Sequence, residues 1–131
     1  MSKVDLTRKF VPVKIAVLTI SDTRSLENDK SGDLLVSKIK DAGHLLVKRG
    51  ITQDNIQKIK INLQQSIQDP DIDVVISTGG TGLTGRDVTP EAFRSIFDKE
   101  IEGFGEMFRY LSFQKIGTST LQSRALAGVS G

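Results

Sequence analysis

Cysteine is absent from this chain of 131 residues, and aromatic residues make up only 5% of it. The lack of cysteine excludes disulfides, thiolate metal sites and a cysteine nucleophile, and it fits a reducing cytoplasm, which is the expected compartment. Few aromatic rings leave little surface for stacking on bases. The net charge is only +2, with no basic stripe, so the composition argues against a nucleic-acid partner.

Long apolar runs are also lacking, and none approaches the length of a membrane span, so no membrane partner is expected. Residues 1–9 are polar and mixed in charge, unlike a secretory signal. Hydrophobic residues at 37% and charged residues at 26% are typical of a soluble domain with its own core. We expect residues 13–131 to form that domain and residues 1–12 to form an N-terminal arm.

Strand and helix patterns alternate along the chain. Residues 13–20 are nearly all apolar and predict a parallel strand covered on both faces, whereas residues 44–51 predict a strand nearer the sheet edge. Residues 73–77 predict a third strand. Each strand is followed by apolar residues at helical spacing: Leu34, Leu35, Ile39 and Ala42, then Ile56, Ile59, Leu63 and Ile67, then Ala92, Phe93, Ile96 and Phe97. This order predicts an α/β fold with a mostly parallel sheet between helices.

Two helix starts are suggested by capping residues. Asp54, with Gln57 three positions later, predicts a capping box for the second helix. Thr89 is expected to cap the third helix, with Pro90 at its first helical position. Residues 100–110 predict a further helix, and the small, polar stretch 117–128 has no clear assignment.

The most informative stretch is a glycine loop at residues 79–87, directly after the third strand. Its sequence, Gly-Gly-Thr-Gly-Leu-Thr-Gly-Arg-Asp, has four glycines in seven positions, which lets a ligand approach the backbone. Ser77 and Thr78 before the loop, and Thr81 and Thr84 within it, add hydroxyls. A strand, a glycine loop and a helix start together form an arrangement that binds phosphate, although a tight turn also favours glycine.

Three polar segments follow the three strands: residues 21–23, residues 52–54 and the glycine loop. Ligands of parallel sheets bind outside the carboxyl ends of the strands, so these segments should meet at one rim. The loop matches neither common phosphate motif. It ends in Gly85-Arg86-Asp87 rather than Gly-Lys-Ser/Thr, and it follows the third strand rather than the first. The pattern therefore predicts a phosphate-containing ligand of open identity.

Among the charged candidates, Asp87 could hold Mg²⁺ beside bound phosphates, or merely favour the next helix start by about 0.3–1 kcal/mol. For Asp54, the residues alone favour a helix cap. Asp22 could cap, turn or bind, and Arg86 could neutralise phosphate or stay solvated. The lone His44 lies far from the loop in sequence and is interpreted as structural.

Several segments together carry a family resemblance. They are Ala16-Val17-Leu18-Thr19-Ile20-Ser21-Asp22-Thr23-Arg24, Glu27-Asn28-Asp29-Lys30-Ser31-Gly32, the run from Ser77 to Ala92, Gly103-Phe104-Gly105-Glu106-Met107-Phe108-Arg109, Ile116-Gly117-Thr118-Ser119 and Ser123-Arg124-Ala125-Leu126-Ala127-Gly128. The chain resembles the MoaB/MogA family of molybdenum cofactor biosynthesis proteins, on the MoaB branch, which is related to a domain of gephyrin.

The resemblance implies a three-layer α/β/α fold, a trimer or hexamer, and contact with other molybdenum cofactor biosynthesis proteins. It implies molybdopterin binding and adenylylation of molybdopterin with Mg-ATP. Asp54 and Asp87 match the catalytic aspartates of adenylylating members, and Asp87 would also place Mg²⁺. The implied substrate and phosphate contacts are Ser21, Asp22, Ser77, Thr78, Gly79, Gly80, Thr81, Gly82 and Arg86, with Ser119 and Ser123 on the pterin.

Two departures from the family pattern matter. Gly85 stands where relatives usually have proline, and relatives continue past residue 131 through a strand, a Pro-Gly-Ser/Asn loop and a helix, which this chain is expected to lack. Two alternatives to an adenylyltransferase therefore remain open: a non-catalytic molybdopterin-binding or scaffold member, and a general nucleotide-phosphate module.

Overall fold

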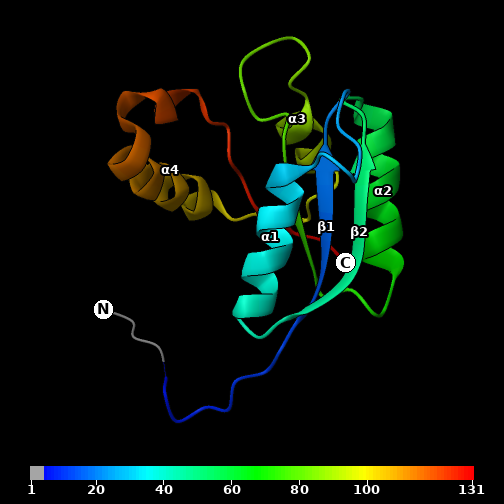
Figure 1. Ribbon diagram of the computed structural model, residues 1–131, viewed down its shortest axis with the longest axis vertical. Helices are drawn as coiled ribbons and strands as arrows, with labels where there is room; N and C mark the ends of the chain where they lie inside the picture. The colour runs from blue at the N-terminus through cyan, green and yellow to red at the C-terminus, as the bar shows by residue number, and fades with distance from the viewer. Residues whose placement is uncertain (1–4) are drawn as a thin grey trace.

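The computed structural model describes residues 5–131, so the first four residues of the expected N-terminal arm lie outside the described part. A parallel sheet of three strands forms the centre of the molecule: β1 (Lys14–Ile20), β2 (Leu45–Thr52) and β3 (Val74–Thr78). Their order is β2-β1-β3, which puts the nearly all-apolar β1 in the middle and β2 at an edge, as predicted. All three strands point to the same end of the sheet (Figure 1).

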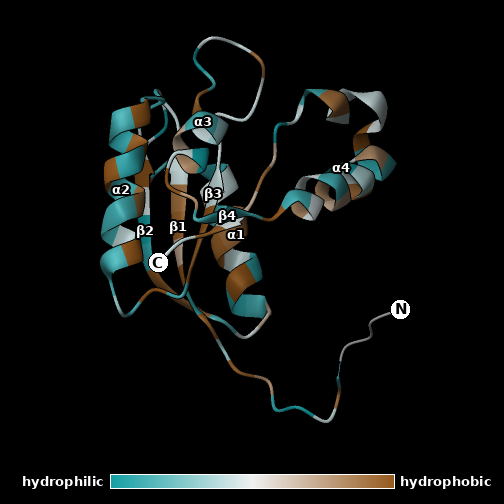
Figure 2. Ribbon diagram, turned by 180° about the vertical axis from the view of Figure 1, so that it is seen from behind, coloured by the Kyte–Doolittle hydropathy of each residue, from teal (hydrophilic) through white to brown (hydrophobic). Residues whose placement is uncertain are grey.

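Helices cover both faces of this sheet. Ile15 and Val17 of β1 pack with Ile39 of α1 (Lys30–Asp41) on one face. Leu18 and Ile20 point to the opposite face, where they pack against α2 (Ile56–Gln68) and α3 (Thr89–Arg94). Figure 2 shows the brown, apolar β1 between the helices. The alternation along one strand thus builds two cores, and the predicted three-layer α/β/α fold is confirmed.

The rest of the chain stands beside the sheet. After the short β4 (Lys99–Glu100), the predicted helix is longer than expected and forms α4 (Glu102–Ile116). The unassigned stretch becomes the 3-10 helix η1 (Gly117–Gln122), followed by an extended segment. That segment ends in β5 (Gly128–Val129), which pairs antiparallel with β4. We call residues 102–122 the α4–η1 lobe; it projects away from α1–α3 (Figure 1).

The capping residues of α2 and α3 differ from the prediction. Asn55, rather than Asp54, caps α2, because its side chain accepts a hydrogen bond from the Lys58 amide at 3.0 Å. Asp and Asn are about equally good caps, so adjacent candidates cannot be separated by propensity. α3 begins at Thr89 with Val88 as its cap, and the Thr89 hydroxyl donates instead to the Gly79 carbonyl at 2.8 Å. Both predicted caps were therefore wrong.

Two apolar helical faces also differ from the prediction, one in its burial and one in its length. Ile56 and Ile67, at the two ends of α2, are exposed, whereas Ile59 and Leu63 between them are buried. α3 ends at Arg94, so Ile96 lies beyond the helix, yet it still packs against the core. Spacing identifies the face of a helix, but the sheet covers only the part that lies over it.

His44 has the structural role expected for it. Its Nδ1 accepts a hydrogen bond from the Val13 amide at 3.1 Å, and its ring lies 5.2 Å from that of Phe10. Within residues 5–131, the helices are too short or too polar to cross a bilayer.

Candidate functional site

The three polar loops meet at the carboxyl end of the parallel strands. The Ser21 amide donates to the Thr52 carbonyl at 2.8 Å, which extends the β1–β2 pairing into the loops. One step further, the Asp54 amide donates to Asp22 Oδ1 at 3.1 Å. From the glycine loop, Arg86 pairs with the carboxylate of Asp22. The parallel register, rather than any local signal, brings these distant residues together.

Two glycines allow the loop to lie flat against the sheet and α3. Gly79 has φ +103°, and a Cβ there would lie 2.1 Å from the carbonyl oxygen of Ile20. Gly80 has φ +69°, and a Cβ there would lie 2.2 Å from Thr89 Oγ1 and 2.9 Å from Asp54 Oδ1. Both positions therefore exclude a side chain. The backbone of the loop consequently runs directly beside the carboxylate of Asp54.

Because Asn55 takes the capping role, the Asp54 side chain is left to face this loop. Burial raises the pKa of Asp54, and the negative charges of Asp22 and Asp87 raise it further. The Arg86 guanidinium, and a hydrogen bond from the backbone of Asp22 to the Asp54 carboxylate, only partly offset these effects on the pKa. The rim thus gathers three carboxylates whose mutual repulsion a cation would relieve.

Asp87 is held inside the glycine loop itself. Its Oδ2 accepts hydrogen bonds from the Thr84 hydroxyl at 2.8 Å and from the Thr84 amide at 3.0 Å. The hydroxyl of Thr84, then its amide, keep the pKa of Asp87 below the ordinary value, with the charge of Arg124 contributing. Asp87 is therefore ionised at neutral pH and fixed in orientation.

Asp22 is the third carboxylate of the rim. Its pKa is lowered, chiefly by the hydrogen bond from Arg86, and also by the Asp54 amide. Arg86 itself is largely exposed, in a stretch of the loop from residue 83 to residue 86 in which every residue is exposed. An incoming phosphate can therefore reach this guanidinium and compete with Asp22 for it.

The remaining predicted residues lie in two places. Ser77 and Thr78 end β3 beside β1, and the Ser21 hydroxyl accepts from the amides of Thr23 and Arg24, both at 3.2 Å. Ser119 is exposed on η1, which belongs to the lobe and not to the rim (Figure 1). Ser123 follows η1, and its carbonyl accepts from Arg109 of α4 at 3.2 Å.

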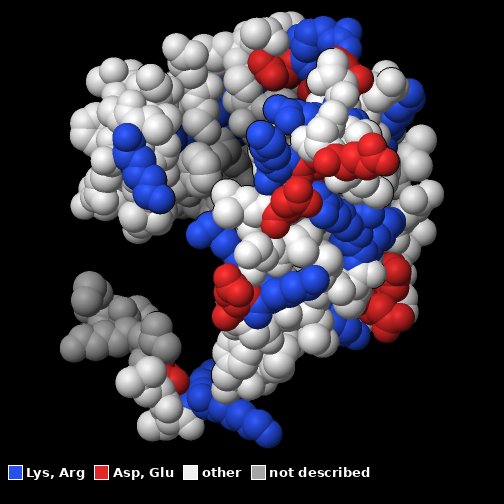
Figure 3. Space-filling model, viewed as in Figure 1, with Lys and Arg blue, Asp and Glu red and all other residues white. Residues whose placement is uncertain are grey.

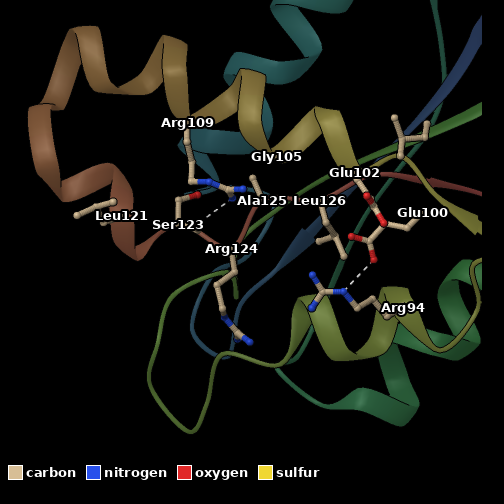
Figure 4. A pocket seen from close by; sticks show the side chains of 11 residues that line it. Arg94, Glu100, Glu102, Gly105, Arg109, Leu121, Ser123, Arg124, Ala125 and Leu126 are labelled. Carbon is tan, nitrogen blue, oxygen red and sulfur yellow. Dashed lines mark hydrogen bonds and ion pairs between the residues drawn. The ribbon is translucent and has the colours of Figure 1, made fainter.

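A cavity of about 290 Å³ lies between the lobe and the segment that follows it. Ser123 and Arg109 line it, together with Arg94, which pairs with Glu100 at 3.0 Å (Figure 4). Its volume is at the lower end for a small-molecule pocket. The cavity lies close to the glycine loop. Arg124, next to Ser123 in the cavity wall, extends from that wall to the loop (Figure 4).

The sequence interpretation missed the roles of two charged residues. Arg124 and Asp29 are both within family-like segments, yet neither was singled out. Asp29 is fully buried, caps α1 by accepting from the Gly32 amide at 3.0 Å, and accepts from the Thr19 hydroxyl at 2.6 Å. An acidic residue just before a helical pattern was the available signal for Asp29. For Arg124 no local signal exists, since all its partners are far along the chain.

The protein offers few ligands for a metal ion at this rim. Within residues 5–131, no three acidic or histidine side chains are grouped so as to hold a metal ion by themselves. Mg²⁺ commonly takes one or two carboxylates and completes its shell with water and substrate phosphates. Asp87 beside a phosphate-binding loop fits that mode, and a site made only of protein ligands does not.

Comparisons with known proteins agree with this geometry. Residues 16–131 match a family described as a probable molybdopterin binding domain. Molybdenum cofactor biosynthesis protein B of Escherichia coli (strain K12) is 49% identical over 125 residues, covering 95% of this chain and 74% of that protein. The corresponding Bacillus cereus protein is 46% identical, covering 91% of this chain and 71% of its own length.

Solved structures show the same likeness. A crystal structure of a molybdenum cofactor biosynthesis protein B superposes with a TM-score of 0.90 at 44% identity, over 95% of this chain and 78% of that one. The tungsten cofactor synthesizing protein MoaB from Pyrococcus furiosus superposes with a TM-score of 0.80 at 37% identity, over 92% and 74% of the two chains. This chain thus spans about three quarters of the length of these relatives.

Proposed function

Because this chain belongs to the family of probable molybdopterin-binding domains, on the MoaB branch of molybdenum cofactor biosynthesis proteins, we propose that it adenylylates molybdopterin with Mg-ATP. A phosphate oxygen of molybdopterin would attack the α-phosphorus of ATP and form the new P–O bond. The bond from that phosphorus to the β-phosphate oxygen would break, and pyrophosphate would leave.

The observation that carries this proposal is the meeting of Asp54, Asp87 and the glycine backbone at one rim. Phosphoryl-type transfer depends mainly on holding two polyanions in line and neutralising their charge. Residues 79–82 offer backbone amides to the phosphates, and Arg86 offers a guanidinium that is already exposed. Ser21, Asp22, Ser77 and Thr78 would line the same rim.

Asp87 is the residue that we propose to hold Mg²⁺, which when bound would supply positive charge to the phosphates. The Thr84 hydrogen bonds fix the Asp87 carboxylate in advance, so little reorganisation is needed on binding. Asp54 would act at the nucleotide side, beside Gly80. Ser123, and with it the cavity next to Arg109, would accept the pterin end, with Ser119 nearby on η1.

We also propose that another copy of the chain packs against the α4–η1 lobe. Gly105 is the only residue of α4 that is buried, although the helix is rich in apolar side chains. The exposed ones of the lobe are Phe104, Met107, Phe108, Tyr110, Leu111, Phe113, Ile116 and Leu121. The face of the lobe in Figure 3 is almost free of charge. Such a surface is typical of an interface, which fits the implied trimer or hexamer.

One observation favours a second candidate, a member that binds molybdopterin without turning it over. The carboxylate of Asp87 already accepts two hydrogen bonds from Thr84, as a residue that only closes a turn would. In that case molybdopterin should bind in the presence of Mg-ATP, and no adenylylated product should form.

The experiment mixes the protein with molybdopterin, ATP and Mg²⁺ and follows adenylylated pterin by mass spectrometry and pyrophosphate by a coupled assay. Product should increase in proportion to the protein. Asp87→Asn should lower the rate by about 10²–10³-fold. Asparagine can still accept from Thr84, so the loop should stay closed. Bound pterin without product would establish the second candidate instead.

The matched control is Asp71→Asn, at an exposed carboxylate that pairs with Lys14 at 3.6 Å before β3, at the opposite end of the sheet. It should leave the rate unchanged. A normal rate in the Asp87→Asn variant would overturn the role proposed for Asp87 even if the wild-type chain is active.

A further inference from the structure

Arg124 makes four hydrogen bonds to the glycine loop and the start of α3. Its Nε donates to the carbonyl of Gly82 at 2.7 Å, and its Nη2 donates to the carbonyl of Asp87 at 2.6 Å. Its Nη1 pairs with Glu91 at 2.6 Å, and its backbone amide donates to the Thr81 carbonyl at 3.0 Å. All four acceptors are at least 33 residues away along the chain.

These acceptors stand on either side of the exposed stretch 83–86. Gly82 precedes it and Asp87 follows it, so a single planar guanidinium bridges the two residues that border this exposed stretch. The five N–H groups of arginine lie in one rigid plane, which lets it bind two carbonyls and a carboxylate at once. A lysine has one nitrogen and no such fixed fork.

Arg124 also connects the loop to the lobe. The preceding carbonyl, of Ser123, accepts from Arg109 of α4 at 3.2 Å. In Figure 4 the Arg124 side chain points away from Arg109 and toward the loop. A continuous series of contacts therefore runs from Arg109 through Ser123 and Arg124 to the loop. It links the cavity wall to the backbone of Asp87.

We propose that Arg124 is a positioning residue that fixes the glycine loop, and with it Asp87, relative to the pterin-side cavity. The effect on kcat that we expect rests on the adenylyl transfer proposed above, whereas the effect on hydrogen–deuterium exchange of the loop does not. Each of the three guanidinium nitrogens already donates to the loop or to Glu91, so the effect of Arg124 is exerted through the loop.

The structural arm compares Arg124→Gln with the wild-type chain by hydrogen–deuterium exchange. Amides of residues 81–88 should exchange at least tenfold faster in the variant, whereas those of β1 should not change. The matched control is Arg94→Gln, which removes the other guanidinium–Glu pair at the cavity and leaves the loop contacts intact. It should leave exchange of residues 81–88 unaltered. Equal loop exchange in Arg124→Gln and the wild-type chain would overturn the proposal.

The activity arm separates positioning from a general loss of folding. For Arg124→Gln we expect kcat to fall about 10–100-fold, because a displacement of about 1 Å in a reacting group can cost that much. KM for Mg-ATP should change less than threefold, and the melting temperature should change little. A fall in kcat that is matched by partial unfolding would contradict a positioning role.

Two further variants divide the contacts. Arg124→Lys keeps a charge near Glu91 but cannot bridge both carbonyls, so loop exchange and kcat should stay close to those of Arg124→Gln. Glu91→Gln removes the ion pair alone and should cost less than threefold in kcat. Wild-type loop exchange and kcat in the Arg124→Lys variant would show that the planar, forked guanidinium is not required.

If the wild-type chain forms no adenylylated product, the proposed function fails while the inference about Arg124 is still decided. The loop exchange of Arg124→Gln, measured against that of Arg94→Gln and of the wild-type chain, then decides the inference. Unchanged exchange would overturn it.

Discussion

Apolar residues are buried at the centre of the sheet, between its three helices, but exposed in the α4–η1 lobe. In β1, six of seven residues are buried, from Ile15 to Ile20. In α4, with fifteen residues, Gly105 alone is buried, and large apolar side chains face outward along the helix. Both segments are rich in apolar residues. Apolar residues favour burial away from water, but the neighbouring elements in the fold decide whether a segment is actually buried.

The same contrast holds for charge. Away from the rim, Arg49 pairs with the buried Asp29 at 3.3 Å and with Asp33 at 2.7 Å, and three further ion pairs lie at more exposed sites. At the rim, Asp54 faces two further carboxylates, and its pKa is raised by burial and by them. Poorly compensated charge at a functional site is a common cost of function, and here it coincides with the proposed phosphate site.

The largest expected difference between the two regions is in core packing. Ile59 of α2 is 0% exposed, so Ile59→Ala should lower the free energy of unfolding by about 2–5 kcal/mol. Phe108 of α4 is 43% exposed in the single chain, so Phe108→Ala should cost less than half as much. Urea denaturation at low protein concentration measures both. Equal losses would show that the lobe is part of the core.

Within the glycine loop the same comparison can be made at two positions. Gly79→Ala would place a Cβ 2.1 Å from the Ile20 carbonyl at φ +103°, so the free energy of unfolding should fall by about 1–3 kcal/mol. Gly85 has open space around it, so Gly85→Ala should change the value by less than about 1 kcal/mol, towards higher stability. Thermal or urea melts decide this, and a stable Gly79→Ala variant would contradict the close approach.

The proposed interface can be broken by charge. Leu111 of α4 is 54% exposed, and Leu111→Glu should raise the dissociation constant of the assembly at least tenfold, about 1.4 kcal/mol, while circular dichroism stays unchanged. Leu34 of α1 is 57% exposed, and Leu34→Glu is the matched control that should not affect assembly. Sedimentation over a concentration series measures both. Equal behaviour of the two variants would move the interface away from the lobe.

The smallest effect concerns the charge on Asp54. Because the pKa of Asp54 is raised in the folded chain, chiefly by burial, the folded state holds this proton at pH values where the unfolded chain has lost it. Stability from this group is therefore present below the unfolded pKa and lost as pH rises through the folded pKa.

Asp54→Asn should accordingly raise the melting temperature at about pH 7 by about 1–3 °C, and the gain should vanish at about pH 3. Asp71→Asn, at the exposed pair with Lys14, should give no such gain. Calorimetry at the two pH values measures both. A gain that persists in acid would mean that the Asp54 charge is not its cause.

Much of the sheet and its helices followed from residue pattern. The apolar run at residues 13–20 predicted β1, and the weaker run at 44–51 predicted an edge strand, because burial on two faces demands apolar residues on both. The helix caps were less predictable. Asp54 and Asn55 are neighbours of similar capping propensity, and the choice of Asn55 depends on how the loop before α2 meets Asp22.

The candidate site, too, could be predicted from the sequence only in part. The glycine loop and the positions of Asp22, Asp54 and Asp87 after their strands could be predicted, because parallel strands deliver their following loops to one edge. The role of Arg124 could not, since its three side-chain partners lie 33 to 42 residues away. No periodicity or local motif encodes such a contact.

The sequence alone thus determined the alternation of strands and helices, the composition of the loops and the family to which the chain belongs. Those features depend on local periodicity and on residue types, which act over a few positions. The tertiary structure decided which carboxylate faces the glycine loop, which apolar helix is exposed and which arginine holds the loop. Those outcomes depend on contacts between distant segments, whose geometry exists only once the sheet has formed.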